Sequence, residues 1–145
     1  MPEASFYILQ THSLSDRFLF ACKLIEKAYR NGQFCYVYTD SLHQSQQLDN
    51  QLWTFRENSF IPHQLYDGVD NIAPDYQQTV LIGTQTAPEK WQKLIFNLSS
   101  NYPENLKKTA RVLEILDNNE ALKKAGRQRF RQYRQDGFEV SAHKI

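Results

Sequence analysis

The sequence predicts an α/β domain of three layers, with a mainly parallel sheet between helices and a basic helix near the end of the chain. Short runs of β-branched and aromatic residues alternate with segments of helical periodicity. This alternation is typical of parallel strands joined by right-handed helical crossovers. The length of 145 residues suits one ordinary domain, and we therefore expect a single domain over residues 1–145.

The first strand and helix are predicted by composition and by capping residues. Residues 4–9 (ASFYIL) have the β-branched and aromatic content of a strand. Ser13 or Ser15 can cap a following helix that runs to Asn31, with Gly32 as its stop. The apolar face of this helix comprises Phe18, Ala21, Cys22, Ile25, Ala28 and Tyr29.

A second strand and helix follow directly. Residues 34–39 (FCYVYT) predict a strand, and Asp40 and Ser41 can cap a helix that runs to about Trp53. The repeated order of strand and helix indicates a βαβα start. The residues expected to face inward from the second helix include Leu42, Ser45, Leu48 and Leu52.

The remaining strands are less regularly spaced. An apolar loop at residues 55–66 and an acidic, turn-rich segment at residues 67–76 precede strands predicted at residues 79–83, 94–98 and 111–116. The connection between the first two of these strands is too short for a full crossover helix. A mixed sheet is therefore left open.

The last 25 residues carry an unusual concentration of positive charge. They contain seven Lys or Arg against two Asp or Glu, while the whole chain has a net charge of only +1. Most of these cations fall on residues 121–135, a run with mostly good helix formers, no proline and Gly137 as its stop. Such charge asymmetry points to an acidic partner.

The predicted basic helix has two different faces. An arc of about 100° holds a phenylalanine inside a ring of cations, and the adjoining flank is a narrow seam that can dock on a core. No acidic residue lies within residues 121–135. We therefore expect the arginines to repel one another, with no carboxylate in this run to offset the repulsion. The arc comprises Lys123, Arg127, Phe130, Arg131 and Arg134, and the seam comprises Leu122, Gly126 and Tyr133.

The sequence does not predict a catalytic, nucleotide or metal site. The turn at residues 10–13 (QTHS) has no glycine that would let a pyrophosphate approach the backbone, and the chain has no P-loop. His12, Asp40 and Thr84 could gather at strand ends as an acid–base set, but helix capping explains Asp40 as well. We expect no catalytic residue, no cofactor and no metal.

The remaining composition predicts a cytoplasmic protein whose two cysteines are not joined in a disulfide. Cys22 and Cys35 lie in apolar contexts in different predicted elements, so we expect buried free thiols. No apolar stretch reaches the length of a membrane span. The first residues do not resemble a secretory signal.

Two stretches of the chain are distinctive. One is Leu52 and Trp53 followed by SFIPH at residues 59–63, and the other is the ending R-x-x-x-Y-R-x-x-G-F, which begins at Arg129. Together with ASFYIL, QFCYVYTDSLHQSQQLDNQLW, ENSFIPHQL and ALKKAGRQRFRQYRQDGFEV, they resemble the chi subunit of bacterial DNA polymerase III, an accessory protein of the clamp-loader complex. The resemblance spans nearly the whole chain and is weakest over residues 67–108.

The resemblance implies a non-catalytic adaptor with a Rossmann-like fold that does not bind nucleotide. Chi proteins pair with the small psi subunit, which tethers them to the clamp loader. They also bind the acidic C-terminal tail of the single-stranded-DNA-binding protein. The positions that the family associates with this tail match Lys123, Arg127, Phe130 and Arg131, although a tyrosine is usual where this chain has Phe130.

The resemblance also implies a psi surface. It places psi contacts at the positions of Trp53 and Phe60, to which we add Pro62 and Leu65 of the same apolar loop. From the residues alone, burial of this loop in the domain's own core and exposure at an interface are about equally supported.

A small nucleic-acid-binding module is the main alternative function. The basic helix would contact phosphates, and Phe130 would stack on a base. Against this, the rest of the chain is net acidic and one short helix offers few phosphate contacts. We therefore expect little direct DNA binding.

Overall fold

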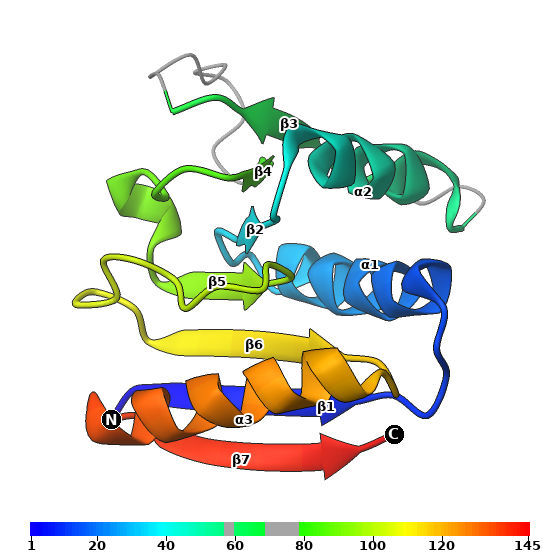
Figure 1. Cartoon of the computed structure of the whole chain (residues 1–145). Helices are drawn as coiled ribbons and strands as arrows, with labels where there is room; N and C mark the ends of the chain where they lie inside the picture. The colour runs from blue at the N-terminus through cyan, green and yellow to red at the C-terminus, as the bar shows by residue number, and fades with distance from the viewer. Residues whose placement is uncertain (57–59, 69–78) are drawn as a thin grey trace.

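The computed structural model describes residues 1–56, 60–68 and 79–145. They form one seven-stranded sheet with strand order β3-β4-β2-β5-β6-β1-β7 (Figure 1). The strands are β1 (Glu3–Ile8), β2 (Tyr36–Tyr38), β3 (His63–Tyr66), β4 (Val80–Gly83), β5 (Leu94–Asn97), β6 (Arg111–Leu116) and β7 (Glu139–Lys144), and the helices are α1 (Leu14–Arg30), α2 (Leu42–Thr54), the 3-10 helix η1 (Glu89–Trp91) and α3 (Glu120–Gln135).

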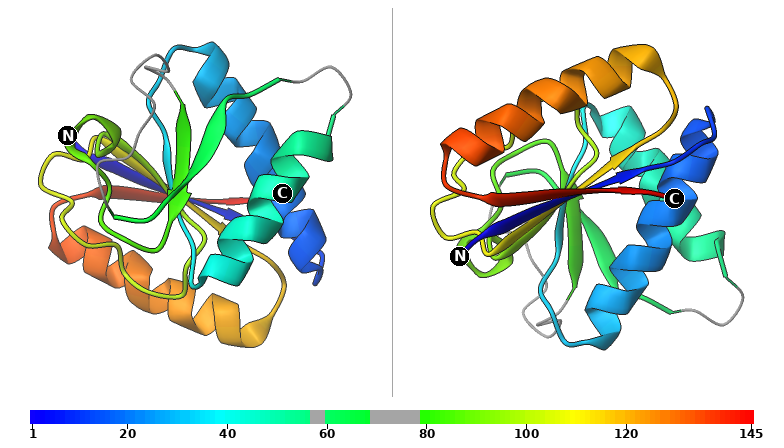
Figure 2. Two further views of the ribbon diagram at one scale, coloured as in Figure 1. Left: turned by 90° about the horizontal axis from the view of Figure 1, so that it is seen from above. Right: turned by 90° about the horizontal axis from the view of Figure 1, so that it is seen from below.

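The helices cover the sheet as three layers. Figure 2 shows α1 and α2 on one face and α3 on the other. Each face has its own apolar cluster because alternate strand residues point to opposite sides. Phe18 and Ile25 of α1 belong to one cluster with Leu113 of β6. Tyr133 of α3 packs with Phe6 of β1 in the other cluster. The predicted three-layer α/β fold is confirmed.

Every strand pairing among the described residues is parallel. The possibility of a mixed sheet was therefore wrong. The chain returns from β4 to the start of β5 with only the short helix η1 in the connection, and β2 lies between these two strands. Trp91 of η1 is buried, and its Nε1 donates to the Thr79 carbonyl over 2.7 Å. One 3-10 turn and an irregular loop thus replace a full crossover helix.

Capping residues set the helix boundaries as predicted. Ser13 Oγ accepts a hydrogen bond from Asp16 N at the start of α1, and Gly32 follows its end with a φ of 74°. Ser41 Oγ likewise accepts from Gln44 N at the start of α2. Gly137 follows the end of α3 with a φ of 91°, a left-handed conformation in which glycine is not strained.

The prediction of the inward-facing residues of α2 was wrong for one residue. Ser45, Leu48 and Leu52 are buried as expected, but Leu42 is 63% exposed. Leu42 is the first residue of the helix, one turn before the buried residues begin. The apolar periodicity therefore extends one turn beyond the part of α2 that is buried.

Two edge strands were not predicted. Within the described ranges, β3 lies in the expected apolar loop and pairs only with β4. In the same ranges, β7 follows α3 and pairs only with β1. Both are polar or partly exposed along their length, so neither has the apolar run that identifies a central strand. Most of the acidic segment expected at residues 67–76 lies outside the described residues, as does Ser59.

Candidate functional site

A buried ion pair holds α3 on the sheet. Glu114 is fully buried in β6, and its Oε1 accepts a hydrogen bond from Arg129 Nη2 at 3.0 Å. Its Oε2 accepts from Arg129 Nε at 3.0 Å, Tyr133 Oη at 2.7 Å and Asn97 Nδ2 at 2.8 Å. Burial and the nearby Glu114 charge raise the pKa of the Tyr133 phenol well above its ordinary value, so the hydroxyl stays a donor. The bidentate pair fixes the rotation of α3 about its axis.

Sequence reasoning missed this cluster. Arg129 lies three residues after Gly126 and four before Tyr133, so it belongs to the seam that docks on the core. Glu114 interrupts the otherwise apolar run of β6. Because a buried charge needs a partner, these two observations together could have identified the pair.

The expected seam is otherwise confirmed. Gly126 and Tyr133 are buried, and Leu122 is half-buried. A Cβ added to Gly126 would lie 2.5 Å from Leu116 Cδ1, so a larger residue at this position would require the Leu116 side chain to shift. The glycine thus lets α3 lie close to β6, and the cationic flank of the helix adjoins this contact.

A groove runs between that flank and the strands β1 and β7. Its volume is about 510 Å³, and all four residues predicted to bind an acidic tail line it. Phe130 forms part of its wall, with its ring centroid 5.4 Å from that of Phe6. The lining comprises Phe6, Ile8, Leu116, Lys123, Gly126, Arg127, Phe130, Arg131, Ala142 and Lys144.

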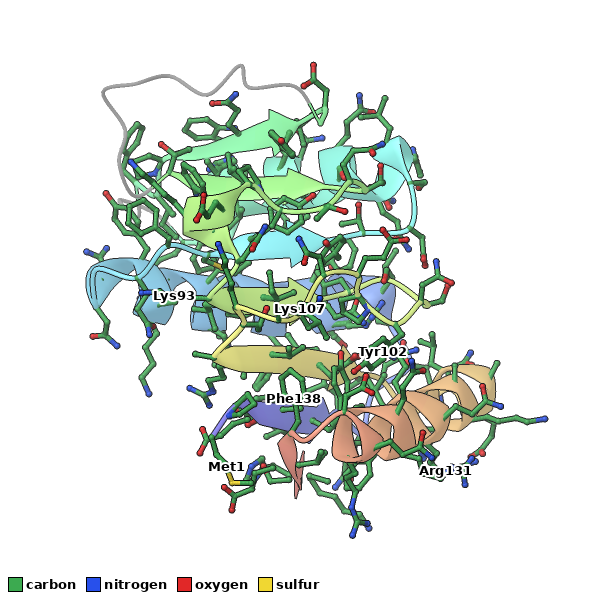
Figure 3. The ribbon with its side chains drawn as sticks, turned by 90° about the vertical axis from the view of Figure 1, so that its left-hand side faces the viewer. Met1, Lys93, Tyr102, Lys107, Arg131 and Phe138 are labelled. Carbon is green, nitrogen blue, oxygen red and sulfur yellow. The ribbon has the colours of Figure 1, made fainter. Side chains whose placement is uncertain are left out.

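The rim of the groove is cationic and its interior is apolar. Three cations come from α3, Lys144 comes from β7, and no acidic residue is among the lining residues that the structure describes. Arg127 and Arg131 are exposed, and Figure 3 shows Arg131 on the side of α3 away from Tyr102. Lys144 was not predicted, because its contribution depends on the unpredicted strand β7.

The expected repulsion between arginines holds only in part. Arg129 is neutralised by Glu114, so it does not join the exposed cations. Lys123 Nζ lies 3.9 Å from Glu120 Oε1, a long and exposed contact. In the described part of the chain, no ion pair reaches Arg127, Arg131 or Arg134. An anionic partner would therefore meet unpaired guanidinium groups.

A second surface lies at the end of α2. Trp53 is 50% exposed and Phe60 is 68% exposed, with ring centroids 5.8 Å apart. The His63 ring packs 4.5 Å from Trp53 and lies within 2.7 Å of the Ile61 carbonyl through Nδ1. His63 Nε2 is 3.1 Å from Asp49 Oδ1, within ion-pair range but without hydrogen-bond geometry. Trp53 thus packs on a histidine ring that is itself held near Ile61 and Asp49.

The structure divides the apolar loop between core and surface. Ile61 is buried, and Phe55 and Leu65 pack against the cluster under α1 and α2. Pro62 is half-buried. Of the four residues predicted to contact psi, only Trp53 and Phe60 are well exposed. The psi contact itself stays a prediction.

The carboxyl ends of β1 and β6 are occupied by the protein's own contacts. The chain leaves the neighbouring strands β1 and β6 toward opposite faces, which is where ligands bind in open α/β sheets. Here Asn118 N donates to the Thr11 carbonyl over 2.8 Å. Arg17 is buried and donates to the carbonyls of Ile115 (2.7 Å) and Leu98 (3.0 Å), and burial lowers its pKa.

Asp40 of the candidate acid–base set is held by hydrogen bonds within the protein. Asp40 Oδ1 accepts from Ser100 N and Ser100 Oγ, at 2.8 and 2.9 Å, and Ser41 caps α2. Cys22 and Cys35 are buried free thiols, as expected, and burial raises the pKa of Cys22 to about 12. Among the described residues, no cluster could hold a metal ion and no helix is long and apolar enough to cross a membrane.

Comparisons with known proteins identify relatives along the whole chain. A family model described as DNA polymerase III chi subunit, HolC, matches residues 1–141. DNA polymerase III subunit chi of Pseudomonas aeruginosa is 32% identical over 145 residues, which cover 100% of this chain and 98% of that protein. The subunit chi of Haemophilus influenzae is 25% identical over 142 residues, covering 98% and 96%.

A solved structure supports the fold alone. The crystal structure of T4 UvsW matches with a TM-score of 0.70 at 12% identity. The match covers 99% of this chain and 41% of the UvsW chain. At this identity the similarity establishes a shared architecture and carries no statement about activity.

Proposed function

The chain belongs to the DNA polymerase III chi subunit family, whose members are accessory subunits in DNA replication, and from that premise we propose a specific linking role. The protein works in the cytoplasm as a non-catalytic adaptor. It connects the clamp loader, through psi, to the acidic C-terminal tail of the single-stranded-DNA-binding protein.

The groove between α3 and β7 is the observation that carries this proposal. A tail of this kind offers carboxylates along its length, an apolar last residue and a free terminal carboxylate. The groove offers an apolar interior beside Phe130 and unpaired cations at its rim, including Lys123, Arg127 and Arg131. Charge-assisted contacts to guanidinium groups would give both affinity and orientation. The phenylalanine at position 130 supplies the wall without a hydroxyl group.

Arg127→Ala is expected to weaken tail binding by about 1.5 to 3 kcal/mol, because it removes a charge-assisted contact that the peptide partly desolvates. Isothermal titration calorimetry with a synthetic acidic tail peptide measures the change. We also expect affinity to fall steeply with added salt, because the contacts are between exposed charges.

Lys124→Ala is the matched control. Lys124 also lies on α3, is exposed and does not line the groove. Its replacement by alanine changes the net charge of the chain by the same amount as Arg127→Ala. We expect a much smaller effect on affinity. Wild-type affinity in Arg127→Ala, or binding that does not depend on salt, would refute this use of the groove.

The exposed pair Trp53 and Phe60 supports the psi half of the proposal. Large apolar side chains that remain exposed beside each other are typical anchors of an interface. The pair lies at the far edge of the sheet from α3 and β7. Two partners could therefore bind at once, as a linking role requires.

A nucleic-acid-binding module remains the second candidate because of the unpaired cations on α3. The position of Phe130 disfavours stacking on a base, because its ring is half-buried and packs on Phe6. We expect only weak binding when the isolated chain is titrated with a fluorescently labelled single-stranded oligonucleotide at physiological salt. Tight binding in this titration would favour the alternative.

A further inference from the structure

β7 presents a free backbone edge next to the groove. It pairs only with β1 among the strands that the structure describes. Glu139 N donates to the Pro2 carbonyl and Ile145 N donates to the Ile8 carbonyl, each over 2.9 Å. Because N–H groups alternate in direction along a strand, the backbone groups of Val140, Ala142 and Lys144 point away from β1.

The same residues face the groove with their side chains. Ala142 and Lys144 line it, opposite α3, and Val140 packs against the cluster under this helix. The unpaired backbone groups and the groove-lining side chains of β7 therefore belong to one set of alternate residues. A segment that paired with this edge would place every second side chain on the α3 side of the sheet.

We propose that an acidic peptide bound in this groove adds to the sheet as an eighth strand along β7. This inference rests on the proposed function and specifies how the tail is held. Backbone hydrogen bonds to β7 position the peptide, and its alternate side chains enter the groove beneath the cations of α3. Strand addition to an exposed edge is an established mode of peptide recognition.

The charge of the edge selects an acidic peptide over a second copy of this chain. Lys144 lies on β7 itself, and Arg127 and Arg131 line the same groove from α3. Two copies paired through β7 would bring two such groups of cations together, at a cost in like-charge repulsion. An acidic strand would instead bring carboxylates to the same cations.

The test is a scan of the peptide with N-methylated residues. The probe is a short synthetic peptide, rich in aspartate and ending in phenylalanine with a free carboxylate, titrated calorimetrically into the full chain. We expect a period of two: methylation of an amide that faces β7 weakens binding about tenfold, because it removes a backbone hydrogen bond and crowds the ladder. Methylation of the next amide changes affinity by about twofold or less.

The possible outcomes separate this inference from the proposed function. If the unmodified peptide binds but methylation at neighbouring positions has equal effects, strand addition is wrong and groove binding stands. If the unmodified peptide does not bind, both fail. If the free chain sediments as a dimer that the peptide does not dissociate, a second copy occupies the edge and the proposal is overturned.

Side-chain substitutions on β7 give an independent measurement. Lys144→Ala is expected to weaken peptide binding about threefold to tenfold, because its ammonium group belongs to the wall against which the peptide lies. Lys124→Ala again serves as the control of equal charge outside the groove. Unchanged affinity in Lys144→Ala would place the peptide away from β7.

Discussion

Glu114→Ala is expected to lower the free energy of unfolding by about 3 to 5 kcal/mol, the range found when one partner of a buried ion pair is removed. The substitution leaves the buried Arg129 guanidinium without its carboxylate. Tyr133 Oη also loses its acceptor, and Asn97 Nδ2 keeps only the carbonyl of Asn101. Urea denaturation followed by circular dichroism measures the change through the midpoint and slope of the transition.

Two variants make this prediction specific. Glu139→Ala removes the same charge from an exposed position on β7, and we expect it to change stability by less than about 0.5 kcal/mol. Glu114→Gln keeps the shape of the side chain and some of its acceptors, so its effect should lie between the two. A Glu114→Ala variant as stable as Glu139→Ala would show that the cluster does not anchor α3.

The helices could be predicted closely from the sequence because their ends depend on local chemistry. Ser13 and Ser41 provide oxygen atoms for free N–H groups, and Gly32 and Gly137 adopt the left-handed conformation that ends a helix. These interactions involve neighbouring residues and leave a direct record in the sequence.

The edges of the sheet could not be predicted in the same way. A central strand such as β6 is buried on both faces, so its apolar run is visible. β3 and β7 lie at the two edges, and β7 has one acidic residue, one histidine and one lysine. Their pairing depends on partners distant in sequence, β4 for β3 and β1 for β7, and composition does not reveal it.

The candidate groove was predicted on one side only. Helical periodicity together with the family resemblance placed Lys123, Arg127, Phe130 and Arg131 on one face of a helix, and the structure brings all four to the same groove. The opposite wall was missed because it is formed by β7, including Lys144. A periodic pattern identifies which residues share a face, but the surface that this face meets is set by tertiary packing.

The second large expected effect concerns the proposed psi surface at Trp53 and Phe60. Trp53→Ala and Phe60→Ala are each expected to weaken psi binding by about 2 kcal/mol or more, as for central aromatic anchors of an interface. Both side chains are at least half exposed in the free chain, so their removal should leave the fold intact. Calorimetry with purified psi subunit measures affinity, and urea denaturation checks stability.

Leu42→Ala is the matched control for this surface. Leu42 also lies on α2 and is also an exposed large apolar residue, but it is at the opposite end of the helix from Trp53. Its removal should leave psi affinity unchanged if the interface is centred on the aromatic pair. Leu65→Ala, by contrast, should lower stability because Leu65 packs against the core. A folded double variant of Trp53 and Phe60 that binds psi with wild-type affinity would remove this surface from the proposal, and the tail-binding groove would then need a different link to the clamp loader.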